Sequence, residues 1–225
     1  MITVHHLEAS RSTRVLWMLE ELELPYEIVR YQRDPKTMLA PKALESVHAL
    51  GKAPVVVDSS GDARVAESGA ILEYLVDTYG KGTWKPAAGT QAARDYTYFL
   101  HYGEGSLMPY LLLKLIFRKI PTSPMPFFAR TVAKKLCEKI EALVVDPNLL
   151  RHLAFLGKHL ETHTWFAGDA ISAADVQMSY PVEALVERSA ELGVSPHLKR
   201  WLDAVHARPA YRRALDKGGP VMLGG

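Results

Sequence analysis

Two short stretches, a dozen residues apart, hold the residue types that could bind a small zwitterionic peptide. Pro54 follows Ala53 at the expected start of a strand, and a cis peptide bond there would turn the backbone N–H and C=O of Ala53 outward, where another peptide can pair with them. Glu67 and Ser68 begin an apolar-periodic helix, whose unpaired N–H groups and positive dipole end suit a carboxylate. Glu67 can pair with an ammonium group. These features predict a binding site for a peptide such as glutathione.

The composition excludes several other kinds of protein. The chain has 225 residues, with 27 Lys and Arg against 25 Asp and Glu, so the charge balance predicts neither a nucleic-acid partner nor an anionic membrane surface. The one cysteine, Cys137, rules out an internal disulfide and favours a reducing compartment. The most apolar run, residues 107–117, is too short to span a bilayer, and no export signal is visible. We therefore expect a cytoplasmic protein.

The first third of the chain predicts alternating strands and helices. Strands are rich in β-branched residues or alternate in hydrophobicity, whereas helices place apolar residues three and four apart. A turn-rich loop at residues 58–62 separates two short strands and predicts a hairpin. In order, we expect a strand at 2–6, a helix from about 12, a strand at 26–31, a weaker helix at 36–48 interrupted by Pro41, a hairpin of 54–57 and 64–66, and a helix at 68–79. This order describes a thioredoxin-like domain over residues 1–79.

Beyond a glycine-rich linker at 80–89, the remaining pattern is helical. Ser172 and Asp175 have the spacing of a capping box, which marks a helix start, and Pro181 predicts a kink in that helix. We expect helices at 91–117, 127–145, 148–162, from 173 onward, 195–207 and 209–217. The predicted fold class is an α/β thioredoxin-like domain followed by an all-helical domain over residues 90–225.

Four motifs in this order resemble the cytosolic glutathione transferase superfamily, most closely its serine-type, theta-like bacterial and fungal members. The motifs span both halves of the chain: Ser-Arg-Ser-Thr-Arg at 10–14, Gly-Lys-Ala-Pro-Val at 51–55, Glu-Ser-Gly-Ala-Ile at 67–71, and Gly-Asp-Ala-Ile-Ser-Ala-Ala-Asp at 168–175. The resemblance implies that Lys52, Ala53, Glu67 and Ser68 hold glutathione and that Pro54 is cis. One departure is His-Ala at 48–49, where the family usually has Asn-Pro.

The resemblance also implies a group that activates the glutathione thiol. A free thiol has a pKa near 8.5, and the thiolate is the nucleophile, so the enzyme must stabilise that anion. A hydroxyl that donates to sulfur does so. Ser10 has the spacing to Arg14 that serine-type relatives show; Ser12 is the second candidate, and Arg11 could assist as a cation. Ser10 could also serve only as a helix cap.

Several other residues invite a functional interpretation. Tyr98, Tyr102 and Ser106 share one face of a long helix and could line a second-substrate pocket, although an aromatic stripe is more often core. Glu104, in the same helix, could reach glutathione in a partner subunit or could simply be solvated.

The histidines and the cysteine give weaker signals. His159 and His163 are four residues apart but lack a third ligand, and His5 and His6 point to opposite faces of a strand. We therefore expect no metal site, and we expect Cys137 to be inert packing.

The function that the resemblance implies is conjugation of glutathione, the co-substrate, to a small hydrophobic electrophile. Two alternatives stay open: glutathione-dependent reduction of peroxides or disulfides, and a non-catalytic binding or dimerisation protein. The intact residues Lys52, Glu67 and Ser68 argue against a mere scaffold. The family also implies a homodimer, in which each active site lies beside the subunit interface.

Overall fold

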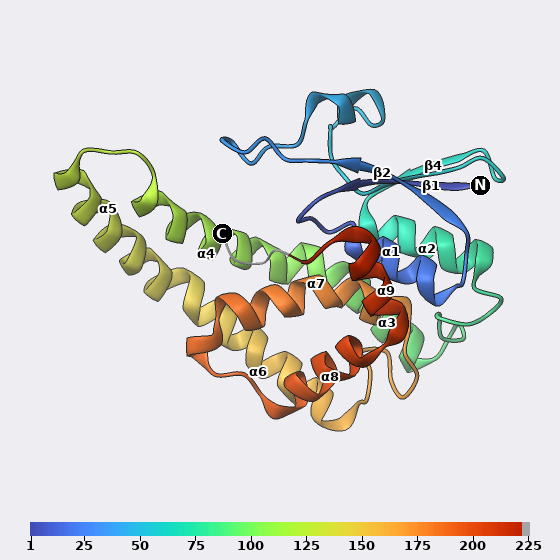
Figure 1. Ribbon diagram of the computed structural model, residues 1–225. Helices are drawn as coiled ribbons and strands as arrows, with labels where there is room; N and C mark the ends of the chain where they lie inside the picture. The colour runs from blue at the N-terminus through green and yellow to red at the C-terminus, as the bar shows by residue number, and fades with distance from the viewer. Residues whose placement is uncertain (222–225) are drawn as a thin grey trace.

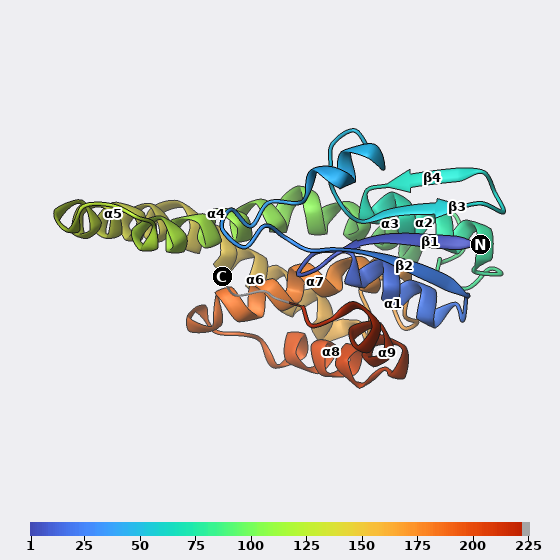
Figure 2. The same ribbon diagram turned by 45° about the horizontal axis from the view of Figure 1, so that its top comes forward.

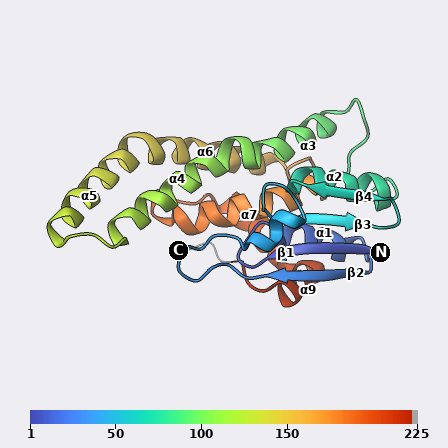
Figure 3. The same ribbon diagram turned by 90° about the horizontal axis from the view of Figure 1, so that it is seen from above.

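The N-terminal third forms one mixed four-stranded sheet. In the computed structural model, which describes residues 1–221, the strands are β1 (Ile2–Leu7), β2 (Tyr26–Tyr31), β3 (Val55–Asp58) and β4 (Ala63–Ala66). They lie side by side in the order β2-β1-β3-β4, as Figure 3 shows from above. β1 pairs parallel with β2 and antiparallel with β3, and β3 pairs antiparallel with β4. The expected βαβ unit and the hairpin are both present.

Two helices, α1 (Thr13–Glu21) and α2 (Ser68–Tyr79), cover one face of this sheet (Figure 1). α1 is enclosed on nearly every side, because the sheet, α7 and α9 all contact it. The strand and helix order is that of a thioredoxin-like domain, as expected.

The prediction of a weak helix at 36–48 is wrong. The structure has only a 3-10 turn there, Lys42–Ser46. The Asp34 carboxylate accepts the backbone N–H groups of Lys36 and Thr37, which folds this stretch into a turn instead of a helix. Pro41 directly precedes the 3-10 turn in extended conformation.

The helices of the second part are α3 (Gln91–Tyr102), α4 (Met108–Lys119), α5 (Phe127–Ile140), α6 (Asp146–Thr162), α7 (Ala173–Arg188), α8 (Pro196–Ala207) and α9 (Pro209–Gly218). Residues 80–90 connect α2 to α3 without a helix or strand. We propose residues 80–89 as the division between the two domains, since the named strands all precede it and the elements after it are helical across the described residues. Of the expected helical domain, residues 222–225 lie outside the described residues.

Two of the long helices contain a single π-helical turn. Gly103–Leu107 joins α3 to α4, and Glu141–Val145 joins α5 to α6. Pro109 and Pro147 follow these turns; each lacks an N–H and would crowd the carbonyl four residues back in a regular helix, a conflict that an extra residue relieves. The helix expected at 148–162 is present as α6, but it begins at Asp146 and continues from α5 through the π turn.

α7 lies at the centre of the second part, with most of its side chains buried (Figure 1). Its capping box is present as expected: the Ser172 side chain accepts the backbone N–H of Asp175, and the Asp175 side chain accepts the backbone N–H of Ser172. The Asp175 carboxylate also accepts the Phe166 N–H and the Trp201 indole N–H, both at 2.9 Å. Burial raises the pKa of Asp175 to about 6, against the effect of these hydrogen bonds.

The C-terminal helix α9 fastens the helical part to α1. Glu20 pairs with Arg213 and Lys217, and Arg208 pairs with Glu21. At the end of α9, Gly218 lies so close to α1 that an added Cβ would be 2.6 Å from Leu16 Cδ1. A larger residue at position 218 would therefore force the buried Leu16 side chain to shift.

α4 and α5 extend together away from the rest of the molecule as a helical arm (Figure 2). The arm, here residues 108–140, exposes many large apolar side chains: Leu112, Leu113, Ile116, Ile120, Phe127, Phe128, Val132 and Leu136. Monomeric proteins seldom expose so many apolar side chains together. In residues 1–221, no helix has both the length and the hydrophobicity that crossing a membrane requires.

We expect Asp175→Ala to lower the free energy of unfolding by about 2–5 kcal/mol, because it leaves buried N–H donors without an acceptor. Urea denaturation at pH 7 measures the effect. Asp169→Ala, at an exposed position in the loop before α7, is the control and should change stability little. Equal losses in the two variants would contradict a central role for Asp175.

Candidate glutathione site

A polar pocket of about 230 Å³ brings together the two stretches that the sequence singled out. It lies at the end of the sheet where the loop after β1, the turn before β3 and the start of α2 meet the π turn between α3 and α4. Its lining residues are Arg11, His48, Leu50, Lys52, Ala53, Pro54, Ala66, Glu67, Ser68 and Glu104. The pocket thus contains every residue that we expected to hold glutathione.

The turn before β3 has the expected backbone. The Ala53–Pro54 peptide bond is cis. Upstream, the Gly51 N–H bonds to the His48 carbonyl at 2.8 Å, and Gly51 has φ of 56°, a conformation that glycine adopts without strain. This turn carries His48, in place of the usual family residue, to the rim of the pocket.

Glu67 is held in a strained backbone conformation at the start of α2. Its φ is 70° and ψ is 124°, a combination that a non-glycine residue rarely adopts and that is found most often at functional sites. Glu67 occupies the N-cap position, yet its side chain makes no capping hydrogen bond. The first N–H groups of α2, beginning with that of the buried Ser68, are therefore available to an anion in the pocket.

The hydroxyls of Ser10 and Ser12 point into the protein instead of lining the pocket. Ser10 Oγ donates to the Leu7 carbonyl at 2.6 Å and lies 2.7 Å from Ser12 Oγ. Because the Ser10 hydroxyl donates its proton to the Leu7 carbonyl, the Ser12 hydroxyl is the donor in the hydrogen bond between the two serines. In this arrangement neither hydroxyl proton is free for a sulfur atom.

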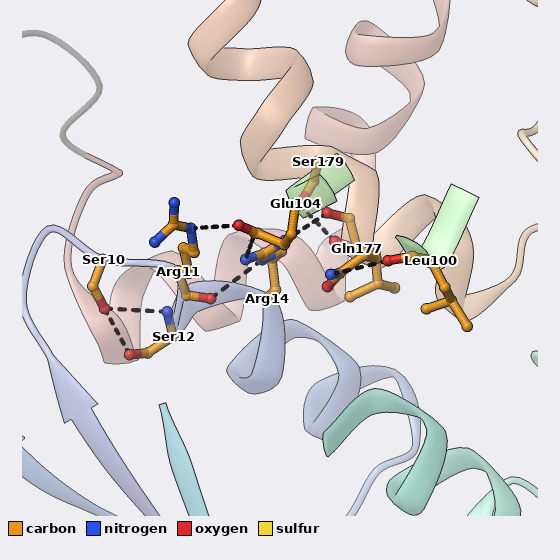
Figure 4. A network of polar contacts seen from close by, with 9 residues as sticks. Ser10, Arg11, Ser12, Arg14, Leu100, Glu104, Gln177 and Ser179 are labelled. Carbon is orange, nitrogen blue, oxygen red and sulfur yellow. Dashed lines mark hydrogen bonds and ion pairs between the residues drawn. The ribbon is translucent and has the colours of Figure 1, made fainter. Parts of the chain in front are cut away.

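Arg11 does line the pocket, and an ion-pair network fixes it there (Figure 4). Its Nε lies 3.1 Å from Glu104 Oε2. The other oxygen of Glu104 accepts from Arg14 Nη2 at 2.6 Å, and Arg14 Nη1 donates to the Gln177 carbonyl at 2.8 Å. Burial lowers the pKa of Arg14, whereas the Glu104 carboxylate acts to raise it. Glu104, for which the sequence offered a partner contact or a solvated position, thus joins the two parts of the same chain.

Tyr98, Tyr102 and Ser106 do not line this pocket. The Tyr98 ring stacks on that of Tyr102, and the Tyr102 hydroxyl lies 2.5 Å from His152 Nδ1 on α6. Ser106 is exposed in the π turn. The buried Tyr102 thus packs α3 against α6, the core role that we weighed for this stripe, whereas Tyr98 is 49% exposed.

The remaining candidates also make structural contacts. The His159 and His163 rings stack at 4.4 Å, and His159 Nε2 lies 3.0 Å from the Phe166 carbonyl oxygen. His5 lies against the Tyr31 hydroxyl, and His6 against the Gly218 carbonyl. Cys137 is buried. Residues 1–221 contain no group of three or more His, Cys, Asp or Glu side chains that could hold a metal ion.

Comparison with known proteins agrees with this fold. Residues 10–78 match the family model for the glutathione S-transferase N-terminal domain, and residues 120–209 match that for the C-terminal domain. The fold agrees with these matches, because it has a thioredoxin-like sheet, a helical second part and a pocket between the two. The chain belongs to the glutathione S-transferase family.

Individual relatives cover nearly the whole chain. It is 36% identical to glutathione S-transferase 3 of Schizosaccharomyces pombe, over 96% of this chain and 88% of that protein. A crystal structure of a glutathione S-transferase from Actinobacillus pleuropneumoniae is 33% identical, with a TM-score of 0.76 over 99% of this chain and 95% of that one. A Pseudomonas fluorescens family member, crystallised with two glutathione molecules bound, is 27% identical with a TM-score of 0.73, covering 95% and 92%.

We expect Glu67→Ala to weaken glutathione binding about ten- to hundredfold, because a charge-assisted hydrogen bond in a partly desolvated site contributes about 1.5–3 kcal/mol. Isothermal titration calorimetry measures the affinity. Glu73→Ala, on the exposed side of α2, is the control and should leave the affinity unchanged. An unaltered affinity in Glu67→Ala would remove this carboxylate from the site.

Proposed function

We propose that this protein conjugates glutathione to electrophiles and that the polar pocket holds the glutathione. The observation that supports this proposal most strongly is the meeting of Lys52, Ala53, Glu67 and Ser68, from separate elements, in a single pocket. The Pseudomonas fluorescens relative, which binds glutathione in its crystal, supports the same assignment.

Each group of the tripeptide has a matching group in the pocket. Glu67 pairs with the ammonium, and the N–H groups at the start of α2 bind the adjacent carboxylate. The backbone of Ala53 pairs with the cysteinyl residue, as an added strand would, and Lys52 binds the terminal carboxylate. With both ends held in this way, the thiol faces the loop after β1, where Arg11 lies. The thiolate sulfur then forms a bond to the electrophile while the leaving group departs with the bonding electrons.

We further propose that Arg11 stabilises the thiolate. Its guanidinium lines the pocket, whereas the Ser10 and Ser12 hydroxyls donate elsewhere. A nearby positive charge favours the ionised thiol and so lowers its pKa. Ser10 would take over this role only if its proton left the Leu7 carbonyl when glutathione binds.

A titration of the thiol of bound glutathione distinguishes thiolate stabilisation by Arg11 from stabilisation by Ser10. We expect Arg11→Gln to raise the pKa of bound glutathione and to slow conjugation at pH 7 about ten- to a thousandfold, the range for losing one preorganised group at an anion. The deficit should shrink as pH rises, because the thiolate then forms unaided. Thiolate absorbance in the ultraviolet follows the titration.

Ser10→Ala is the matched variant in the same loop. We expect it to leave the thiol pKa nearly unchanged and to weaken only the packing of that loop. A raised thiol pKa in Ser10→Ala, with none in Arg11→Gln, would assign activation to the serine.

We also propose a homodimer whose interface includes the helical arm. The apolar side chains that the arm exposes are of the kind that an interface buries. A reducing compartment such as the cytoplasm, which keeps glutathione in its thiol form, agrees with the single buried cysteine.

Analytical ultracentrifugation tests the dimer. We expect a species of twice the 25.1 kDa chain mass at micromolar concentration, and a shift to monomer when Val132 and Leu136 on the arm are replaced by lysine. Val29→Lys, at an exposed apolar position on β2, is the control and should remain dimeric. A wild-type monomer would contradict the proposal.

A further inference from the structure

Arg11 offers an unoccupied pair of hydrogen-bond donors at the end of the pocket. Its side chain is 41% exposed, and Glu104 holds only the Nε side of the guanidinium. Figure 4 shows the two terminal nitrogens turned away from Glu104. Within residues 1–221 neither nitrogen donates a hydrogen bond to the protein. The Arg11 Cζ also lies 5.9 Å from the centre of the Tyr180 ring, a second contact that limits the positions of the side chain.

This end of the pocket has more positive than negative charge. Arg11 and Arg14 share the single carboxylate of Glu104, and Arg14 is only 1% exposed. Burial lowers the pKa of Arg14, and the charge of Arg11, which pairs with the same carboxylate, lowers it further, so the two guanidinium groups repel one another. An anion placed here would relieve that repulsion in a partly desolvated setting, where charges interact more strongly than in water.

We propose that Arg11 is a specificity-determining residue that binds an anionic group, foremost a carboxylate, on the second substrate. This inference rests on the proposed glutathione transferase function. The planar guanidinium presents paired N–H donors that match the two oxygens of a carboxylate. Glutathione itself does not supply this group, because its carboxylates are matched by Lys52 and the start of α2. The electrophile must approach the thiol beside Arg11 and Glu104, so its own carboxylate meets the Arg11 donors.

The test uses a matched pair of conjugates, which separates recognition from thiol activation. S-(2,6-dinitrophenyl)glutathione and S-(4-carboxy-2,6-dinitrophenyl)glutathione differ by one carboxylate, and both carry the sulfur as a thioether. Any role of Arg11 toward the thiolate therefore drops out of the comparison. We expect wild-type protein to bind the carboxylated conjugate about tenfold more tightly by calorimetry, the lower end for a charge-assisted hydrogen bond. The preference should fall as salt is added.

Arg11→Gln should reduce this preference to about one, and Arg11→Lys, which keeps the charge without the fork, should retain part of it. Lys52→Gln is the control: it should weaken both conjugates and leave their ratio intact. Glu104 is unsuitable for substitution because its removal would leave the buried Arg14 unpaired. Thermal unfolding of each variant verifies that it is folded.

Equal binding of the two conjugates by wild type, or a preference that persists in both Arg11 variants, would overturn the inference while leaving the transferase function intact. Failure of glutathione and of both conjugates to bind would overturn the proposed function and this inference together.

Discussion

The buried guanidinium of Arg14 is the constraint on which the geometry of the site depends. A charge so enclosed must be paired, and its partners come from different places: Glu104 from the π turn between α3 and α4, and the Gln177 carbonyl from α7. Satisfying one side chain therefore fixes the first turn of α1 against both helical segments. The same Glu104 carboxylate then sets the position of Arg11 at the pocket. The network that joins the two parts of the chain thus also orients a group in the pocket between them.

The features that could be predicted from the sequence are those encoded by neighbouring residues. Pro54 after Ala53, Glu67 and Ser68 at a helix start, and the Ser172–Asp175 spacing each specify local backbone chemistry, and the structure places them as such. Apolar periodicity likewise gave the sheet, its two helices and most of the helical part. Local patterns sufficed here because in each of these elements the local sequence preference agrees with the final fold.

The features that could not be predicted depend on contacts between distant residues or on small changes of torsion. The Ser10 hydroxyl takes the Leu7 carbonyl as its acceptor, a choice of rotamer that spacing cannot reveal. The role of Glu104 requires Arg11 and Arg14 to approach from ninety residues away in the chain. The sequence pattern predicted separate helices at 127–145 and 148–162, whereas in the structure the π turn at Glu141–Val145 joins α5 to α6 without a break.

The π turn at Gly103–Leu107 has a consequence for how tolerant this chain is to changes of length. A π turn contains one residue more than a regular helical turn, so the helix takes up that residue while α3 and α4 keep their relative orientation. Removing one residue from this turn would restore an ordinary turn with little rotation of α4, whereas removing one from the regular part of α4 would rotate everything beyond it by about 100°. The same single-codon deletion would thus preserve the phase of the helix inside the π turn and change it a few residues further along.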